Sequence, residues 1–214
     1  MTYYQTILVA GQIYHVFNRG VEKRTTFIDS KDYERFVDTL NYYRVKTPPA
    51  RFSFRKRGIF SGRQAETVSI GEIICFCLMP NHFHLLVKQI EEQGITTLLS
   101  KLTNSYTKYF NTKHKRVGPL FQGSFKAVRI ENDEQLIHAT RYIHLNPLMD
   151  YLVKDLKLYP YSSYLEFLGE KSGFCQIKDI LAHFKNPGEY ERFVLDQEDY
   201  ARSLKQMERT LLDK

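Results

Sequence analysis

Hydrophobic and polar positions in the first two-thirds of the chain alternate with the periods of short strands and amphipathic helices. Residues 12–17 alternate and are rich in β-forming side chains, and residues 73–79 form an uncharged run typical of a buried strand. Turn residues at 80–81 join that run to a second strand-like segment at 82–87, which predicts a hairpin. A further strand is expected at 125–130.

Three helices are expected between and after these strands. The first is capped by Asp29 and Ser30, and its apolar stripe consists of Tyr33, Phe36, Val37, Leu40 and Tyr43. The second opens at Thr96 or Thr97. The third is capped by Asn132 with Gln135 three residues on, as in a capping box, and Pro147 is expected to stop it.

The resulting order, β-α-β-β-α-β-α, predicts an α+β fold. It fits a ferredoxin-like, split βαβ antiparallel sheet with helices on one face. We expect residues 1–149 to form the main domain and residues 150–214 to form a C-terminal extension of loops and helices.

Composition narrows the class of protein. The chain has 214 residues, a formal net charge of +7 and a mean hydropathy of −0.42. It holds no apolar run long enough to span a membrane, no signal-peptide pattern and only three cysteines, so we expect a soluble, cytoplasmic protein. The 43% of hydrophobic residues excludes wholesale disorder.

The positive charge is concentrated in the first part of the chain. Residues 1–149 carry a net charge of +9 and residues 150–214 a net charge of −2. One basic cluster contains Arg51, Arg55, Lys56, Arg57 and Arg63, and a second contains Lys113, His114, Lys115 and Arg116. Such clusters bind nucleic-acid phosphates, although a solvated loop explains a lone basic run equally well.

Two motifs carry candidate chemistry. Strand periodicity places His82 and His84 on one face, where two imidazoles can share a metal, although such a pair can also be structural. Tyr142 and Asn146 are four residues apart on one helix face, but the asparagine before a proline also suits a simple helix end. Cys75 and Cys77 are interpreted as core packing, because no CxxC pair supports a zinc site with Cys175.

Four segments, taken together and in this order, resemble one family. They are residues 79–87 (MPNHFHLLV), 120–126 (LFQGSFK), 141–147 (RYIHLNP) and 159–164 (YPYSSY), and residues 14–20 (YHVFNRG) fit the first strand of the same family. From about residue 8 to 170 the chain resembles the Y1 transposases of IS200/IS605 type, and most closely their REP-associated tyrosine transposase branch.

The resemblance implies a single-stranded DNA nuclease and strand transferase. His82, His84 and Asn146 match the metal ligands of the family, with Mg²⁺ or Mn²⁺ as the metal, and Tyr142 matches the nucleophile that forms a 5′-phosphotyrosine. The implied substrate is single-stranded DNA that contains hairpins, and the implied state is a monomer, with a homodimer as the alternative. The expected DNA contacts are the arginines and lysines of the two basic clusters together with Arg19 and Lys126.

Some features depart from the branch or leave alternatives open. The connection at 45–70 is long and basic, Ser124 replaces a usual arginine, and Tyr161 replaces a usual tryptophan. A hairpin-binding module without catalysis, or a metal phosphodiesterase that uses water, would have the same fold. Alternative nucleophiles are Tyr106 and Tyr109, and surface roles are expected for His138 and His144.

Overall fold

The computed structural model describes residues 7–46, 48, 52 and 68–196. Its centre is a four-stranded antiparallel sheet in the order β2-β3-β1-β4, formed by β1 (Ile13–Arg19), β2 (Gly71–Met79), β3 (His82–Gln89) and β4 (Lys126–Ile130). The segment order β1-α1-β2-β3-α3-β4 and this strand order are those of a ferredoxin-like split βαβ sheet, so the predicted fold class is confirmed.

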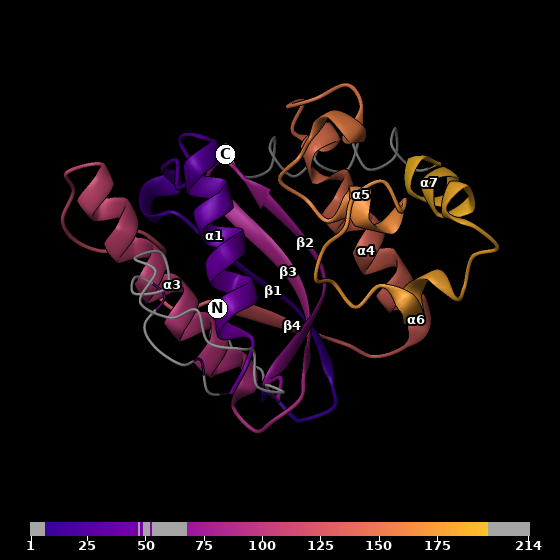
Figure 1. The fold of residues 1–214 in the computed structure, drawn as a ribbon, viewed down its shortest axis with the longest axis horizontal. Helices are drawn as coiled ribbons and strands as arrows, with labels where there is room; N and C mark the ends of the chain where they lie inside the picture. The colour runs from indigo at the N-terminus through magenta and orange to yellow at the C-terminus, as the bar shows by residue number, and fades with distance from the viewer. Residues whose placement is uncertain (1–6, 47, 49–51, 53–67, 197–214) are drawn as a thin grey trace, which may run out of the picture.

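Helices cover both faces of the sheet (Figure 1). The helices α1 (Ser30–Tyr43) and α3 (Gly94–Lys113) pack on one face, as predicted for a split βαβ fold. Helix α4 (Asp133–Met149) packs on the opposite face against β2 and β3. The expectation that helices lie on one face is therefore wrong for α4, because β2 carries apolar side chains on both of its sides and each side requires a cover.

The segment after α4 packs against that helix. Among the described residues it contains one short helical turn, η2 (Leu156–Leu158), and three helices, α5 (Tyr164–Phe167), α6 (Lys178–Leu181) and α7 (Pro187–Leu195). Another short helical turn, η1 (Val21–Lys23), follows β1. Tyr164, Phe167, Tyr190 and Val194 share one buried cluster with α4 and β2. The division of the chain at residue 149 stays a prediction.

Helix α1 begins as the sequence predicts, because the Asp29 side chain accepts a hydrogen bond from the backbone N–H of Asp32. Helix α3 begins earlier than predicted, at Gly94, with Gln93 in the left-handed region (φ 57°). A Cβ on residue 94 would lie 2.0 Å from the carbonyl oxygen of Ile70, so only glycine permits this approach. The threonines at 96 and 97 lie inside the helix and cap nothing.

Helix α4 runs past the proline that was expected to stop it. Asn132 caps its start as predicted, accepting from the N–H of Gln135. Pro147 lacks the N–H that would bond the carbonyl of Ile143, but the side-chain amide of Asn146 donates to that carbonyl at 3.4 Å and to the carbonyl of Tyr142 at 2.8 Å. The asparagine therefore supplies the missing donor, and the helix continues to Met149.

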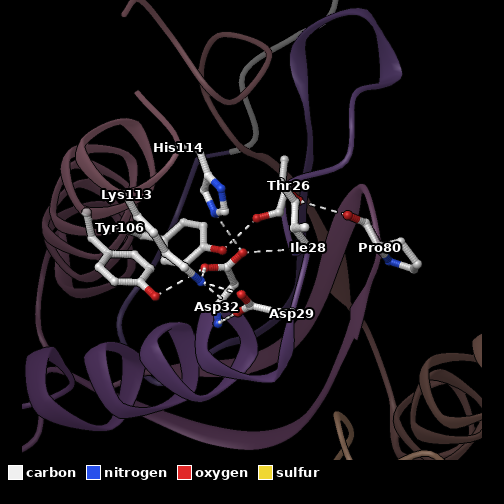
Figure 2. A network of polar contacts seen from close by, with 9 residues as sticks. Thr26, Ile28, Asp29, Asp32, Pro80, Tyr106, Lys113 and His114 are labelled. Atoms are coloured by element: carbon white, nitrogen blue, oxygen red, sulfur yellow. Dashed lines mark hydrogen bonds and ion pairs between the residues drawn. The ribbon is translucent and has the colours of Figure 1, made fainter. Parts of the chain in front are cut away.

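A buried carboxylate joins the start of α1 to the end of α3 (Figure 2). Asp32 accepts hydrogen bonds from the Tyr109 hydroxyl, the Lys113 ammonium group, the His114 imidazole and the N–H of Ile28. Burial opposes its ionisation, but these donors outweigh that effect and hold the pKa of Asp32 below its ordinary value.

Candidate functional site

The two motif histidines lie on the face of β3 that points toward α4. Phe83, Leu85 and Val87 belong to the core beneath α1 and α3, so the intervening His82 and His84 point to the other side, as the alternation predicts. Their rings meet edge to face with centroids 4.9 Å apart. His84 is 6% exposed and His82 is half-buried.

Helix α4 brings the candidate nucleophile to these histidines. The Tyr142 ring stands edge-on to the His84 ring, with centroids 5.7 Å apart. Residues 143–149 are buried, whereas the Tyr142 side chain is 46% exposed at the edge of the helix. The structure therefore places an accessible phenol beside the histidine pair within one chain.

His15 is a third imidazole at this place, and sequence reasoning missed it. It lies on β1, where Tyr14 and Val16 point into the opposite core, and β1 pairs directly with β3. Its Nε2 is 2.9 Å from Nδ1 of His84, the two rings are stacked, and its ring is 5.8 Å from that of Tyr142. The strand alternation at 12–17 could have placed His15 on this face, but only the pairing of β1 with β3 brings it to His84.

The electrostatics of His15 favour a neutral imidazole. Burial lowers its pKa to about 4, because the surrounding protein cannot solvate an imidazolium as water does. A neutral ring keeps one nitrogen as a hydrogen-bond acceptor.

The donor set suits a divalent metal ion. His82 engages the side-chain oxygen of Asn81 through Nδ1 at 2.6 Å, and His84 engages His15 through its own Nδ1. With Nδ1 of each ring turned to a protein partner, Nε2 is the nitrogen that can bind a metal. Within the described ranges, no three His, Cys, Asp or Glu side chains are grouped as metal ligands. The amide oxygen of Asn146, on the helix that faces the pair, is a donor of another type.

Asn146 is buried one helical turn beyond Tyr142. Its side-chain nitrogen is held by the carbonyls of Tyr142 and Ile143, which fixes the orientation of the amide. An amide oriented by its nitrogen presents its oxygen in one direction, which suits a ligand role.

The alternative nucleophiles lie on the other side of the sheet. Tyr106 is fully buried beneath α1, where its hydroxyl donates to the carbonyl of Thr26, and Tyr109 donates to Asp32. Neither phenol reaches the face that carries His82 and His84.

The two flanking histidines differ from each other. His138 is exposed, as expected, and contacts Arg141. The expected surface role of His144 is wrong, because this residue is fully buried between the Tyr190 hydroxyl at 2.7 Å and the Ser163 hydroxyl at 2.9 Å. Helix α7 and the 159–164 segment pack over α4 and bury His144. No local sequence pattern around residue 144 predicts this burial.

The predicted DNA-binding residues fall into three groups. Five of them, namely Arg51, Arg55, Lys56, Arg57 and Arg63, lie outside the described residues. Arg19 and Lys126 are exposed at the ends of β1 and β4, and Lys126 pairs with Phe17, whose ring contacts that of His84.

The third group is the 113–116 cluster. Lys115 is exposed, whereas Lys113 forms ion pairs with Asp29 and Asp32, and Arg116 donates to Asn111 and to the carbonyl of Pro119. Burial alone would lower the pKa of Lys113, but the two carboxylates raise it above its ordinary value. Lys113 therefore holds α1 to α3, which the sequence did not predict.

The interpretation of Cys75 and Cys77 as core residues is confirmed. Cys75 and Cys77 are buried in the core beneath α4, and burial raises the pKa of the Cys75 thiol. Tyr161 stacks on Tyr33 with ring centroids 3.6 Å apart, so the aromatic at this position packs against α1. No described helix is long and apolar enough to cross a membrane.

Fold and site together define a ferredoxin-like α+β domain with a histidine pair facing a tyrosine on a crossing helix. Residues 58–146 match the family model described as "Transposase IS200 like", which confirms the resemblance seen in the motifs of this chain.

Two known proteins are similar to this chain, one in sequence and one in fold. A curated protein of Haemophilus influenzae strain Rd, provisionally named a REP-associated tyrosine transposase, is 26% identical over 103 residues, which are 44% of this chain and 58% of that protein. The chain thus matches little more than half the length of this relative. A solved structure described as a REP-associated tyrosine transposase bound to a REP hairpin has the same fold, with a TM-score of 0.54, 17% identity, and coverage of 81% of this chain and 92% of the other.

Proposed function

We propose that this protein is a metal-dependent single-stranded DNA endonuclease and strand transferase that uses Tyr142 as its nucleophile. The observation that carries the proposal is the position of the Tyr142 ring, half-exposed and 5.7 Å from the His84 ring on the facing strand. The family match over residues 58–146, which includes both histidines, Tyr142 and Asn146, supports the same activity.

His82, His84 and Asn146 would hold the divalent ion, for which Mg²⁺ or Mn²⁺ suits a site of mixed nitrogen and oxygen ligands. A metal bound there would polarise the scissile phosphate and stabilise the charge that develops on its oxygens. The three side chains are themselves held by protein partners, because Asn81, His15 and the helix carbonyls engage the atoms that face away from the ligand.

Tyr142 would attack the phosphorus atom through its phenolic oxygen. A Tyr–O–P bond forms as the P–O3′ bond breaks, which leaves the 5′-phosphate on Tyr142 and a 3′-hydroxyl on the released strand. The phenol proton can leave to water, since the side chain is 46% exposed. Attack by a 3′-hydroxyl of another strand reverses the step and joins DNA without a nucleotide cofactor.

DNA that contains a hairpin is the proposed substrate. The structurally similar transposase is described as bound to a REP hairpin, and the net charge of +9 in residues 1–149 suits a polyanion. Arg19 and Lys126 are the described basic residues that we assign to DNA contacts beside the site, with Lys115 further away. Contact between Tyr142 and His84 of the same chain supports a monomer with a complete site.

The test is a covalent-adduct assay with end-labelled single-stranded DNA hairpins taken from the flanks of the gene, with Mg²⁺ or Mn²⁺. Wild-type protein should give a metal-dependent shifted band, and Tyr142→Phe and His82→Ala should abolish it. Tyr151→Phe is the matched control, since it removes the hydroxyl of a tyrosine that is 61% exposed just after α4 and should leave the band intact.

Other results would favour the alternatives. Cleavage that gives no adduct and survives Tyr142→Phe would indicate a phosphodiesterase that uses water. Tight hairpin binding without cleavage in either metal would indicate a binding module.

A further inference from the structure

His15 contacts two residues of the proposed site, His84 and Tyr142, but is neither a ligand nor a nucleophile in the function proposed above. Its Nε2 lies 2.9 Å from Nδ1 of His84, a distance typical of a hydrogen bond. Its ring stacks on His84 with centroids 5.1 Å apart and meets Tyr142 edge-on at 5.8 Å. One side chain of β1 therefore lies against groups carried by β3 and α4.

The direction of the hydrogen bond decides what His84 can do. If His15 donates from Nε2, then Nδ1 of His84 is the acceptor and the proton of neutral His84 sits on Nε2, which blocks that nitrogen as a ligand. If His84 donates from Nδ1, its Nε2 keeps a lone pair. His82 and Asn81 offer a parallel case, because an amide oxygen can only accept and so places the proton of His82 on Nδ1.

We propose that His15 is a positioning residue that accepts a hydrogen bond from Nδ1–H of His84 and thereby holds His84 in the tautomer whose Nε2 can bind a metal. The proposal rests on the function proposed above, since that function makes His84 a ligand, but the tautomer itself is a property of the metal-free protein.

The first experiment measures the tautomer directly. Long-range ¹H–¹⁵N spectra of the imidazoles at pH 7.5, without metal, should show the proton of His84 on Nδ1 in wild-type protein. In His15→Ala this preference should be lost, and in His15→Gln it should be retained, because the glutamine oxygen can accept the same hydrogen bond. A wild-type His84 that is protonated on Nε2 would overturn the proposal.

The second experiment measures metal affinity in the same variants by titration with Mn²⁺, followed by the EPR signal of the free ion. His15→Ala should bind Mn²⁺ about 10-fold or more weakly, the range typical of removing an outer partner of a ligating histidine, and His15→Gln should recover most of the affinity. Phe17→Leu is the matched control, because Phe17 contacts the His84 ring from the same strand face without a hydrogen bond.

The outcomes separate this proposal from the function on which it rests. Unchanged Mn²⁺ affinity in His15→Ala, while wild-type protein binds Mn²⁺ and forms the DNA adduct, would refute the role of His15 alone. Absence of Mn²⁺ binding and adduct in wild-type protein would refute the proposed function, and the His84 tautomer would still report whether His15 accepts the hydrogen bond.

Discussion

Burial of His144 makes the stability of this fold depend on pH in a calculable way. The imidazole is fully enclosed between α4, α7 and the 159–164 segment, and burial lowers its pKa to about 3. In the unfolded chain the same group has a pKa of about 6.5. Below pH 6.5 the unfolded state therefore binds a proton that the native state does not, so the stability contributed by His144 is complete above that pH and decreases as the pH falls toward 3.

The size of the effect follows from the two pKa values. Between pH 7.5 and pH 5 the free energy of unfolding should decrease by about 2 kcal/mol from this residue. The calculated decrease is nearly the same for any pKa of His144 of about 4 or below in the folded protein, because the folded protein then keeps this imidazole neutral between pH 7.5 and pH 5. With an ordinary urea dependence of about 2 kcal/mol per molar, the loss corresponds to a shift of about 1 M in the urea midpoint.

The assay is urea unfolding at pH 7.5 and pH 5 in wild type and His144→Gln. The variant should be less stable than wild type at both pH values. Its free energy of unfolding, however, should change between pH 7.5 and pH 5 by about 2 kcal/mol less than that of wild type, since glutamine does not titrate in this range. His138→Gln is the matched control, because it removes an exposed histidine from the same helix and leaves the buried one in place. Equal pH differences in wild type and His144→Gln, or an NMR titration of His144 near pH 6.5, would refute the reasoning.

Two further predictions concern the charged residues. Asp32→Asn should destabilise the fold by about 3 kcal/mol at pH 7, measured by urea unfolding, because it removes the buried negative charge that pairs with Lys113 and replaces one of the two acceptor oxygens with a donor. Since the Asp32 pKa is lowered, the wild-type advantage should shrink below about pH 4, and an advantage that persists there would contradict this account. Lys126→Gln should weaken binding to a single-stranded hairpin and reduce the slope of log affinity against log salt by about 1, as measured by fluorescence anisotropy. Lys178→Gln, which changes an exposed lysine of α6 outside the predicted DNA contacts, serves as its control, and an equal effect of both changes would argue against a DNA contact specific to Lys126.

Much of the fold was predictable from local patterns. The hairpin of β2 and β3, the Asp29 and Asn132 caps and the stripe of α1 depend on neighbouring residues, and each is found where the sequence places it. The predicted helix ends are wrong where a contact outside the local sequence pattern decides the boundary. The start of α3 follows from the approach of Gly94 to Ile70, and the continuation of α4 past Pro147 follows from a side-chain bond of Asn146.

The candidate site was predictable in part. Alternation along one strand places His82 and His84 on a common face, and helical spacing places Asn146 one turn from Tyr142, since both relations are fixed by backbone geometry. That Tyr142 lies against His84 was implied by the family resemblance and not by the residues themselves, because no local pattern tells which face of the sheet α4 covers.

The sequence by itself therefore determined the elements, their order and the faces on which the motif residues lie, because strand and helix periodicity act over a few residues. Only the tertiary structure decided which faces meet. Pairing of β1 with β3 brings His15 to His84, and α7 encloses His144. The carboxylates of Asp29 and Asp32 bind Lys113, which was expected to contact DNA. These contacts join residues between 46 and 84 positions apart, and they form because both faces of the sheet must be covered and buried polar groups need partners.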